Sequence, residues 1–126
     1  MFLQSSGTFR NTETFLRKML RVDSEIMSAL HRGGMKGVLA LRLATPVESG
    51  RAAASWDYEI TKRRGVYILT WTNSDIEDGF PVAIMLQYGY GTGNGGYVQG
   101  IDYINPALRP IFDEISAELW KVVTSS

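Results

Sequence analysis

The segment from Gly91 to Gly96 has the G-x-G-x-x-G spacing of a dinucleotide-binding fingerprint. Asp113 follows Gly93 at the distance expected of an acid that binds a ribose hydroxyl. In that fingerprint the glycines open directly into a helix whose N-terminus binds the pyrophosphate. Here Tyr97-Val98-Gln99-Gly100 follows instead, and the next strand of such a unit is missing. We therefore predict no nucleotide cofactor.

Other residue types that could do chemistry are sparse. The chain has no cysteine, which excludes disulfides, thiolate nucleophiles and thiolate-bound zinc. His31 is the sole histidine, and its place beside Gly33 predicts an interaction with the negative end of a helix. Asp75, Glu77 and Asp78 lack the spacing of a calcium-binding loop, so we interpret them as a solvated turn. The sequence predicts no catalytic residue, no metal site and no enzyme.

The composition is that of one folded domain, with 126 residues, 44% of them hydrophobic and 21% charged. No apolar run approaches the length of a membrane helix, and the first residues lack the features of a signal peptide. We therefore expect synthesis in the cytoplasm and no membrane contact. The net charge is zero, but residues 1–63 hold 10 Lys or Arg against 6 Asp or Glu, and residues 64–126 hold 3 against 7.

Two basic groups are candidate interaction residues, namely Arg17, Lys18 and Arg21, and Lys62, Arg63 and Arg64. A protein that binds DNA through its backbone needs several cations in one place, and a neutral chain argues against that role. We expect DNA contact to be incidental, and ordinary solvated surface is the alternative for both groups. If the fold keeps the two charge signs on opposite faces, identical copies can attract head to tail and close into a ring. Random scatter of the charges over the surface is the other interpretation.

The hydrophobic spacing predicts two helical runs in the first third of the chain. An amphipathic helix begins at Asn11 or Thr12 and ends at Gly33-Gly34, and a second run covers residues 35–44. Together they form either one long bent helix or a helix pair. After a turn, residues 56–61 and 66–72 read as a β-hairpin. The second of these strands is apolar on both faces, so we expect it to be central in a sheet or covered on both sides.

Residues 80–88 are too apolar for a surface loop and predict a short helix, with a strand as the alternative. Six glycines between positions 89 and 100 predict a long stretch without regular structure. Asn105 and Pro106 mark the start of a last helix. Pro110 should make this helix restart or kink, so that it runs cleanly from about 110 to 123. The prediction is a single α+β domain over residues 1–126, in which a small, mostly antiparallel sheet packs against a long N-terminal helix and a C-terminal helix.

The glycine-rich stretch is also the predicted interaction site, because a loop of this length in a compact domain usually binds something. Tyrosines alternate with its glycines, and tyrosine is enriched at protein interfaces. The candidate residues are Tyr88, Gly89, Tyr90, Gly91, Thr92, Gly93, Gly96, Tyr97 and Tyr103. A base-stacking platform made of Trp56, Trp71, Tyr67 and Phe80 is a second possibility, but core packing explains these aromatic residues better.

Three spaced motifs resemble a known family. They are Thr45-Pro46-Val47-Glu48-Ser49-Gly50-Arg51 with Ser55-Trp56, Leu86-Gln87-Tyr88-Gly89 with Gly91-Thr92-Gly93, and Pro106-Ala107-Leu108-Arg109-Pro110 with Phe112. In order and spacing they look like the motifs of the tailed-bacteriophage tail-completion family, the head–tail joining proteins of the neck. The family usually has Asp where Glu48 stands, and a tyrosine and an alanine where this chain has Pro81-Val82-Ala83.

The resemblance implies a non-enzymatic virion protein at the top of the tail, with an α+β fold. It implies a ring of identical copies, hexameric in the family, which contacts the tail tube or tail terminator protein and the head-closure or connector protein. A tail terminator or head-closure role in the same particle is an alternative. A small nucleic-acid-binding module that uses Lys62, Arg63 and Arg64 is another. Edge-strand addition between subunits, involving the hairpin and the glycine-rich stretch, would be a natural docking mode.

Overall fold

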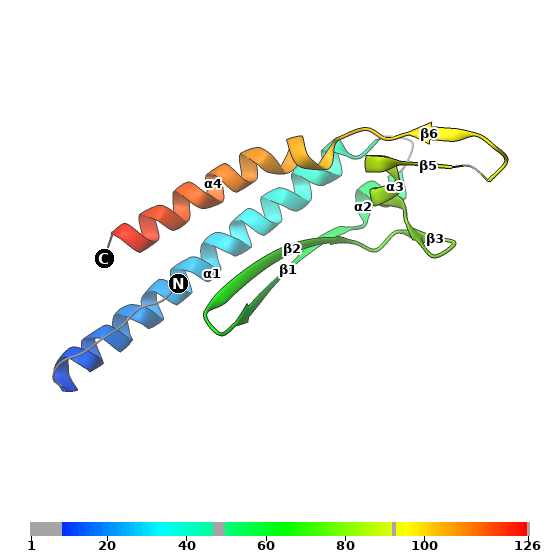
Figure 1. The fold of residues 1–126 in the computed structure, drawn as a ribbon. Coiled ribbons are helices and arrows are strands. Elements are labelled where there is room, and N and C mark those ends of the chain that lie inside the picture. Colours follow the sequence, from blue (N-terminus) through cyan, green and yellow to red (C-terminus); the bar gives the residue numbers. More distant parts are fainter. Residues whose placement is uncertain (1–8, 47–49, 92, 126) are drawn as a thin grey trace.

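The computed structural model describes residues 9–46, 50–91 and 93–125, with side chains from residue 20 onward. Helix α1 (Phe9–Ala44) and helix α4 (Ile104–Thr124) lie side by side, and a hairpin of β1 (Trp56–Arg63) and β2 (Val66–Asn73) packs against them (Figure 1). The predicted α+β class, with a long N-terminal helix, antiparallel strands and a C-terminal helix, is confirmed. At about 1.5 Å per residue, α1 spans about 54 Å.

Helix α1 is continuous, so the prediction that it ends at Gly33-Gly34 was wrong and the single long helix was the correct alternative. The glycines are buried because α1 meets its neighbours there. An added Cβ atom would overlap a side chain at each position: Ile115 at Gly33, Tyr58 at Gly34 and Trp71 at Gly37. These glycines are sites of close approach between elements, and tertiary packing outweighs their low helix propensity.

The core lies between α1, α4 and the inner face of the β1–β2 hairpin. Its buried members are Val22, Ile26 and Leu30 of α1 and Ile115 of α4. Partly buried hydrophobic residues pack around them, namely Ile60, Tyr67, Leu69, Trp71, Ile111, Leu119 and Val122. Burial of apolar surface, worth about 25 cal/mol per Å², is therefore the main force that joins the two helices and the hairpin. Ion pairs of Arg32 with Glu118 and Lys36 with Glu114 also join α1 to α4, but they are solvent-exposed and contribute little.

The β1–β2 hairpin has the predicted place and the tight turn that its sequence favours. Arg64 and Gly65 form the turn with φ of 53° and 78°, which is the backbone geometry that suits a two-residue hairpin connection. Among the described strands β2 pairs only with β1, so the expectation of a central strand is not met in this single chain. Val66 and Ile68 on its outer face are 56% and 50% exposed.

Short elements gather at the other end of the hairpin. Helix α2 (Gly50–Ala54) is followed, after the hairpin, by β3 (Ile76–Glu77), β4 (Phe80–Pro81) and α3 (Val82–Tyr88). The predicted short helix is thus confirmed. The glycine-rich stretch is more regular than expected, because β5 (Gly89–Gly91) and β6 (Tyr97–Gln99) pair as an antiparallel hairpin. We call this β5–β6 hairpin the arm; it projects away from the two long helices (Figure 1).

Helix α4 begins one residue before the predicted cap, since Ile104 is already helical and Tyr103 is the N-cap. Pro110 lies within a continuous helix, so the predicted restart at this position was wrong. The carbonyl that loses its partner to Pro110 is that of Pro106, and both residues are exposed. Water can therefore satisfy this carbonyl, and the helix continues.

Candidate functional site

The base of the arm is held by the side chain of Gln87, which is buried although polar. Its Oε1 accepts hydrogen bonds from the backbone N–H groups of Tyr103 and Ile104 at 3.0 and 2.9 Å. Its Nε2 donates to Asp102 Oδ1 at 2.7 Å. Gln87 thus satisfies two donors at the start of α4 and fixes the point where the arm returns to the body.

Tyr103 belongs to this base and not to an exposed surface. Its side chain is 6% exposed, and its hydroxyl donates to the carbonyl of Ala83 at 2.7 Å. Burial raises the pKa of Tyr103 above its usual value. Its inclusion among the interaction residues is therefore corrected, because it anchors the start of α4 to α3. Sequence spacing gave a hint, since Tyr103 lies beyond the last glycine of the stretch.

A second set of polar contacts joins the end of α1 to the hairpin. Thr45 Oγ1 donates to the carbonyl of Leu41 at 2.6 Å and accepts from Trp56 Nε1 at 2.9 Å. Asp75 is 2% exposed, and Arg51 Nε lies 3.3 Å from its Oδ1. This contact is an ion pair without hydrogen-bond geometry, because Oδ1 has no hydrogen-bond partner. The predicted solvated turn is therefore wrong for Asp75, which is buried and paired with Arg51.

The arm shows why its glycines are needed at particular positions. Gly89 has a φ of +86°, and an added Cβ atom would lie 2.7 Å from the carbonyl oxygen of Val98 across the hairpin. Gly93 and Gly95 have φ of +83° and +90° in the turn, where other residues would be strained. Thr92 lies outside the described residues. The glycines therefore allow the backbone conformation of this hairpin.

The surface of the arm is uncharged and rich in tyrosine. No charged residue occurs from Tyr88 to Ile101. Tyr88 and Tyr97 are 69% and 67% exposed, and Tyr97 donates its hydroxyl to the carbonyl of Tyr88 at 3.3 Å. Gly91, Gly93 and Gly96 are exposed as well, whereas Gly89 and Tyr90 are half-buried.

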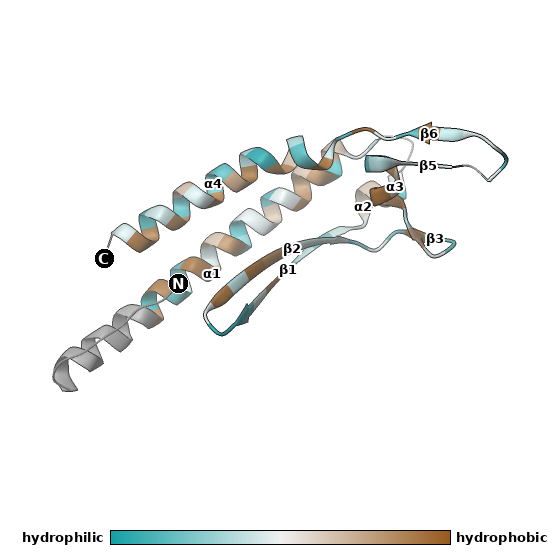
Figure 2. Ribbon diagram, in the orientation of Figure 1, coloured by the Kyte–Doolittle hydropathy of each residue, from teal (hydrophilic) through white to brown (hydrophobic). Residues whose placement is uncertain are grey.

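Exposed apolar side chains continue from the arm onto α3. Phe80 of β4 and Ile84 and Tyr88 of α3 are exposed, whereas Ala83 and Gln87 of α3 are buried. Figure 2 shows α3 as strongly apolar. Groups of exposed apolar side chains are typical of protein contact sites. We call Phe80, Ile84, Tyr88 and Tyr97 the arm surface.

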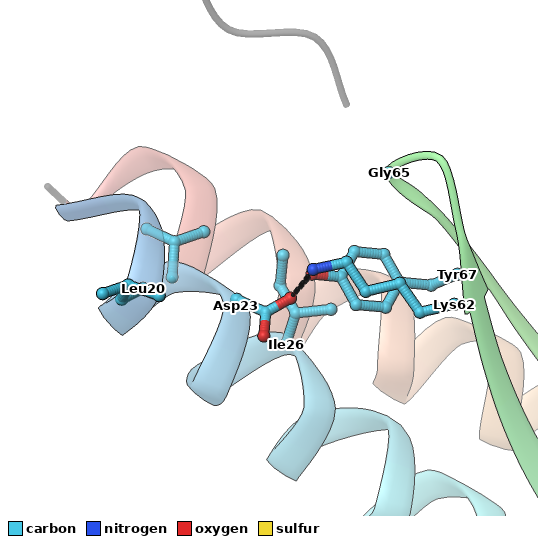
Figure 3. Close-up of a pocket in the computed structure, with 7 residues that line it drawn as sticks. Leu20, Asp23, Ile26, Lys62, Gly65 and Tyr67 are labelled. Atoms are coloured by element: carbon cyan, nitrogen blue, oxygen red, sulfur yellow. Dashed lines mark hydrogen bonds and ion pairs between the residues drawn. The ribbon is translucent and has the colours of Figure 1, made fainter. Parts of the chain in front are cut away.

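The basic residues of the β1–β2 turn lie at the far end of the hairpin. Lys62 pairs with Asp23 of α1, and Tyr67 donates its hydroxyl to the same carboxylate (Figure 3). The hydrogen bond from Lys62 lowers the pKa of Asp23. These residues line a pocket of about 220 Å³ with Leu20, Val22, Ile26 and Gly65. Lys62 is thus partly neutralised.

The pair of Lys62 with Asp23 brings the β1–β2 turn next to the part of α1 that follows Arg21. Arg63 and Arg64 are exposed at the turn, and Arg21 is exposed on α1. The side chains of Arg17 and Lys18 lie outside the described residues.

Other candidate chemistry has structural explanations. His31 lies in the middle of α1, so its predicted interaction with a helix end was wrong; its Nδ1 lies 2.9 Å from the hydroxyl of Tyr58. Tyr67 and Trp71 pack against the core as expected, whereas Phe80 is 60% exposed. Within residues 9–46, 50–91 and 93–125, no three His, Cys, Asp or Glu side chains come together as a metal site. None of the helices in the described part of the chain is long and apolar enough to cross a membrane.

No protein-family model, curated protein or solved structure matches the chain. Inference about its function therefore rests on its motif residues and on the surfaces that these residues position.

Proposed function

We propose that this chain is a non-enzymatic structural protein of a bacteriophage neck, which joins the tail to the head as part of a ring of identical copies. In this role it contacts the tail tube or terminator protein on one side and the head-closure or connector protein on the other. The virion would be its final location, after synthesis in the host cytoplasm.

The observation that carries the proposal is the position of the motif residues. Thr45 and Trp56 of the first motif hydrogen-bond to each other, and Gln87 of the second motif supports the start of α4, just before the third. Gln87 of the second motif therefore holds the base from which the uncharged arm projects. A protein that assembles by contact needs such a rigid base and an exposed apolar surface, and it needs no catalytic group.

A nucleic-acid-binding module receives less support. Its best cation, Lys62, pairs with Asp23, and the exposed Arg63 and Arg64 offer few charges for phosphate neutralisation. A tail terminator or head-closure role uses the same kind of surface and differs only in the partner.

Electron microscopy of lysates from the encoding phage, with this gene deleted, tests the proposal. Filled heads lying apart from finished tails are expected, whereas tails of abnormal length would favour a terminator role and leaking heads a head-closure role. Intact infectious particles would refute any neck function.

Complementation links the defect to the arm surface. A Tyr88→Ser, Tyr97→Ser double variant should fail to restore joined particles, because both side chains are exposed and leave the core unchanged. Leu20→Ser is the matched control, since Leu20 is 72% exposed but lies beside the β1–β2 turn. Equal rescue by both variants would remove the arm surface from the proposal.

A further inference from the structure

Strand β2 has the composition of a central strand but occupies an edge. Its sequence, Val-Tyr-Ile-Leu-Thr-Trp-Thr-Asn, contains no charge, and both of its faces carry apolar residues. In the described chain it has a partner only on the β1 side. An apolar edge strand offers unpaired backbone N–H and C=O groups and is a site for pairing with another chain.

The two strands of the hairpin differ in how their edges are protected. Strand β1 carries Asp57, Glu59, Lys62 and Arg63, and charges of this kind discourage the addition of another strand. Strand β2 has no such charge along its eight residues. The asymmetry indicates that the β2 edge is the one adapted to receive a strand.

The neighbouring face of α4 is also incompletely covered. Phe112 of α4 contacts Trp71 of β2 with ring centroids 5.8 Å apart, so β2 is the strand that reaches toward α4. Phe112 and Val123, which with Leu119 lie on one side of α4, are 50% and 44% exposed. Strands in a sheet are about 4.8 Å apart, whereas packed helices are about 8–10 Å apart. A two-stranded sheet therefore covers little more than one helix, and a further strand beside β2 would cover this side of α4.

We infer that the arm of a second copy of this chain adds to the free edge of β2, with β6 as the added strand. The arm is an uncharged hairpin whose outer edges have no partner among the described strands. Its glycines allow close backbone approach, and the exposed Tyr97 is available for packing on α4. Val98, also exposed, lies on the opposite face of β6, as Ile68 lies on the outer face of β2.

The arm of the same chain cannot fill this position. Its base is fixed to the start of α4 by Gln87, and it points away from the long helices (Figure 1). A second copy is free of this restriction. Each copy then uses two different surfaces, so the contact is heterologous and closes into a ring when the rotation per subunit permits. This ring contact rests on the neck role proposed above and defines its subunit interface.

Cysteine cross-linking tests the contact directly, because the chain has no cysteine of its own. Chains with Ile68→Cys on β2 are mixed with differently tagged chains with Val98→Cys on the arm, and a mild oxidant is added. A disulfide forms only between Cβ atoms about 4 Å apart, so it cannot span an intervening strand. The matched control is Thr61→Cys, since Thr61 is paired opposite Ile68 on the charged strand β1. The same pairs are then tested in particles from the complemented phage.

We expect links between Ile68→Cys chains and Val98→Cys chains. The linked product should be lost when Thr61→Cys replaces Ile68→Cys. The inference is overturned if that link is missing from both purified protein and particles, or if the Thr61→Cys chains link equally well. Predominant links between two Ile68→Cys chains would indicate a symmetric edge-to-edge dimer instead, and links to another virion protein would assign the edge to that protein. Ile68→Lys, at a half-exposed position, should fold normally but lose ring formation, whereas Thr61→Lys should keep it. If the deletion mutant gives unjoined heads and tails but the cross-link is missing, only this contact is refuted. If the deletion mutant gives intact particles, the neck role itself is refuted.

Discussion

Replacing Gly34 by alanine should destabilise the protein, although the same change stabilises most helices. In an exposed helix the substitution gains about 1 kcal/mol of helix propensity. Here the new Cβ would overlap the aromatic ring of Tyr58, which cannot bend away as a flexible side chain can. Overpacking of this kind costs about 1–3 kcal/mol. The Trp71 Nε1 hydrogen bond to the Gly34 carbonyl, 3.0 Å long, would be strained as well, at about 1 kcal/mol.

The net effect is a loss of about 2 kcal/mol in the free energy of unfolding, taking these values together. A chain of 126 residues has an unfolding entropy of about 265 cal/mol/K, so Tm should fall by about 8 °C. Thermal and urea unfolding followed by circular dichroism would measure both quantities.

Gly50→Ala is the matched control, because nothing lies within 4 Å of the added Cβ and its φ is not in the left-handed region. It should leave Tm unchanged or raise it slightly. A Gly34→Ala variant with a Tm equal to or above that of the parent would refute the close-approach explanation for the glycines of α1. Gly33→Ala should cost less than Gly34→Ala, since the atoms that it meets are at the flexible end of Ile115.

Other consequences of the structure can be measured separately. Gln87→Ala should lower the free energy of unfolding by about 1–2 kcal/mol, because two buried donors at the start of α4 lose their acceptor, and urea unfolding would show whether it does. Arg51→Ala should lower the free energy of unfolding by about 1 kcal/mol in the same assay, because the buried Asp75 loses its ion-pair partner. The expected loss is small because Arg51 is largely exposed, and an unchanged urea midpoint would contradict it. The hydrogen bond from Lys62 lowers the pKa of Asp23 in the folded chain. The contact therefore stabilises the fold fully at pH values above the usual carboxyl pKa of 3.8, and this contribution is lost as the pH falls through the lowered pKa. Asp23→Asn should flatten that part of the pH dependence of Tm. Amide hydrogen exchange should be fast in the arm of the isolated chain and slow in assembled particles, and strong protection before assembly would disprove an arm that orders on a partner.

Local patterns in the sequence were sufficient for the elements that depend on local chemistry. The β1–β2 hairpin follows from alternating residues around Arg64-Gly65, and α3 from its apolar run, and both are present. The errors arose where a distant element changes what a residue does. Gly33 and Gly34 read as a helix end because the side chains that fill the space above them lie far away in the sequence.

The candidate site was predictable in part for the same reason. Glycine and tyrosine spacing located the arm, and the exposure of Tyr88 and Tyr97 agrees with a surface role. The burial of Tyr103 and the support that Gln87 gives to α4 were not predictable, because both depend on a contact between α3 and α4 that no local pattern encodes. Asp75 is a similar case, since neither its burial nor its pair with Arg51, 24 residues away in the sequence, can be read from a polar turn.

The failed expectation that β2 is a central strand is also the most informative one about assembly. The sequence of β2 is that of a strand with neighbours on both sides, and the isolated fold gives it one. Natural edge strands are protected by charge, as β1 is, because unprotected edges aggregate. An unprotected β2 beside an incompletely covered α4 is a liability in a monomer, but it is consistent with a chain whose sheet is completed by another copy.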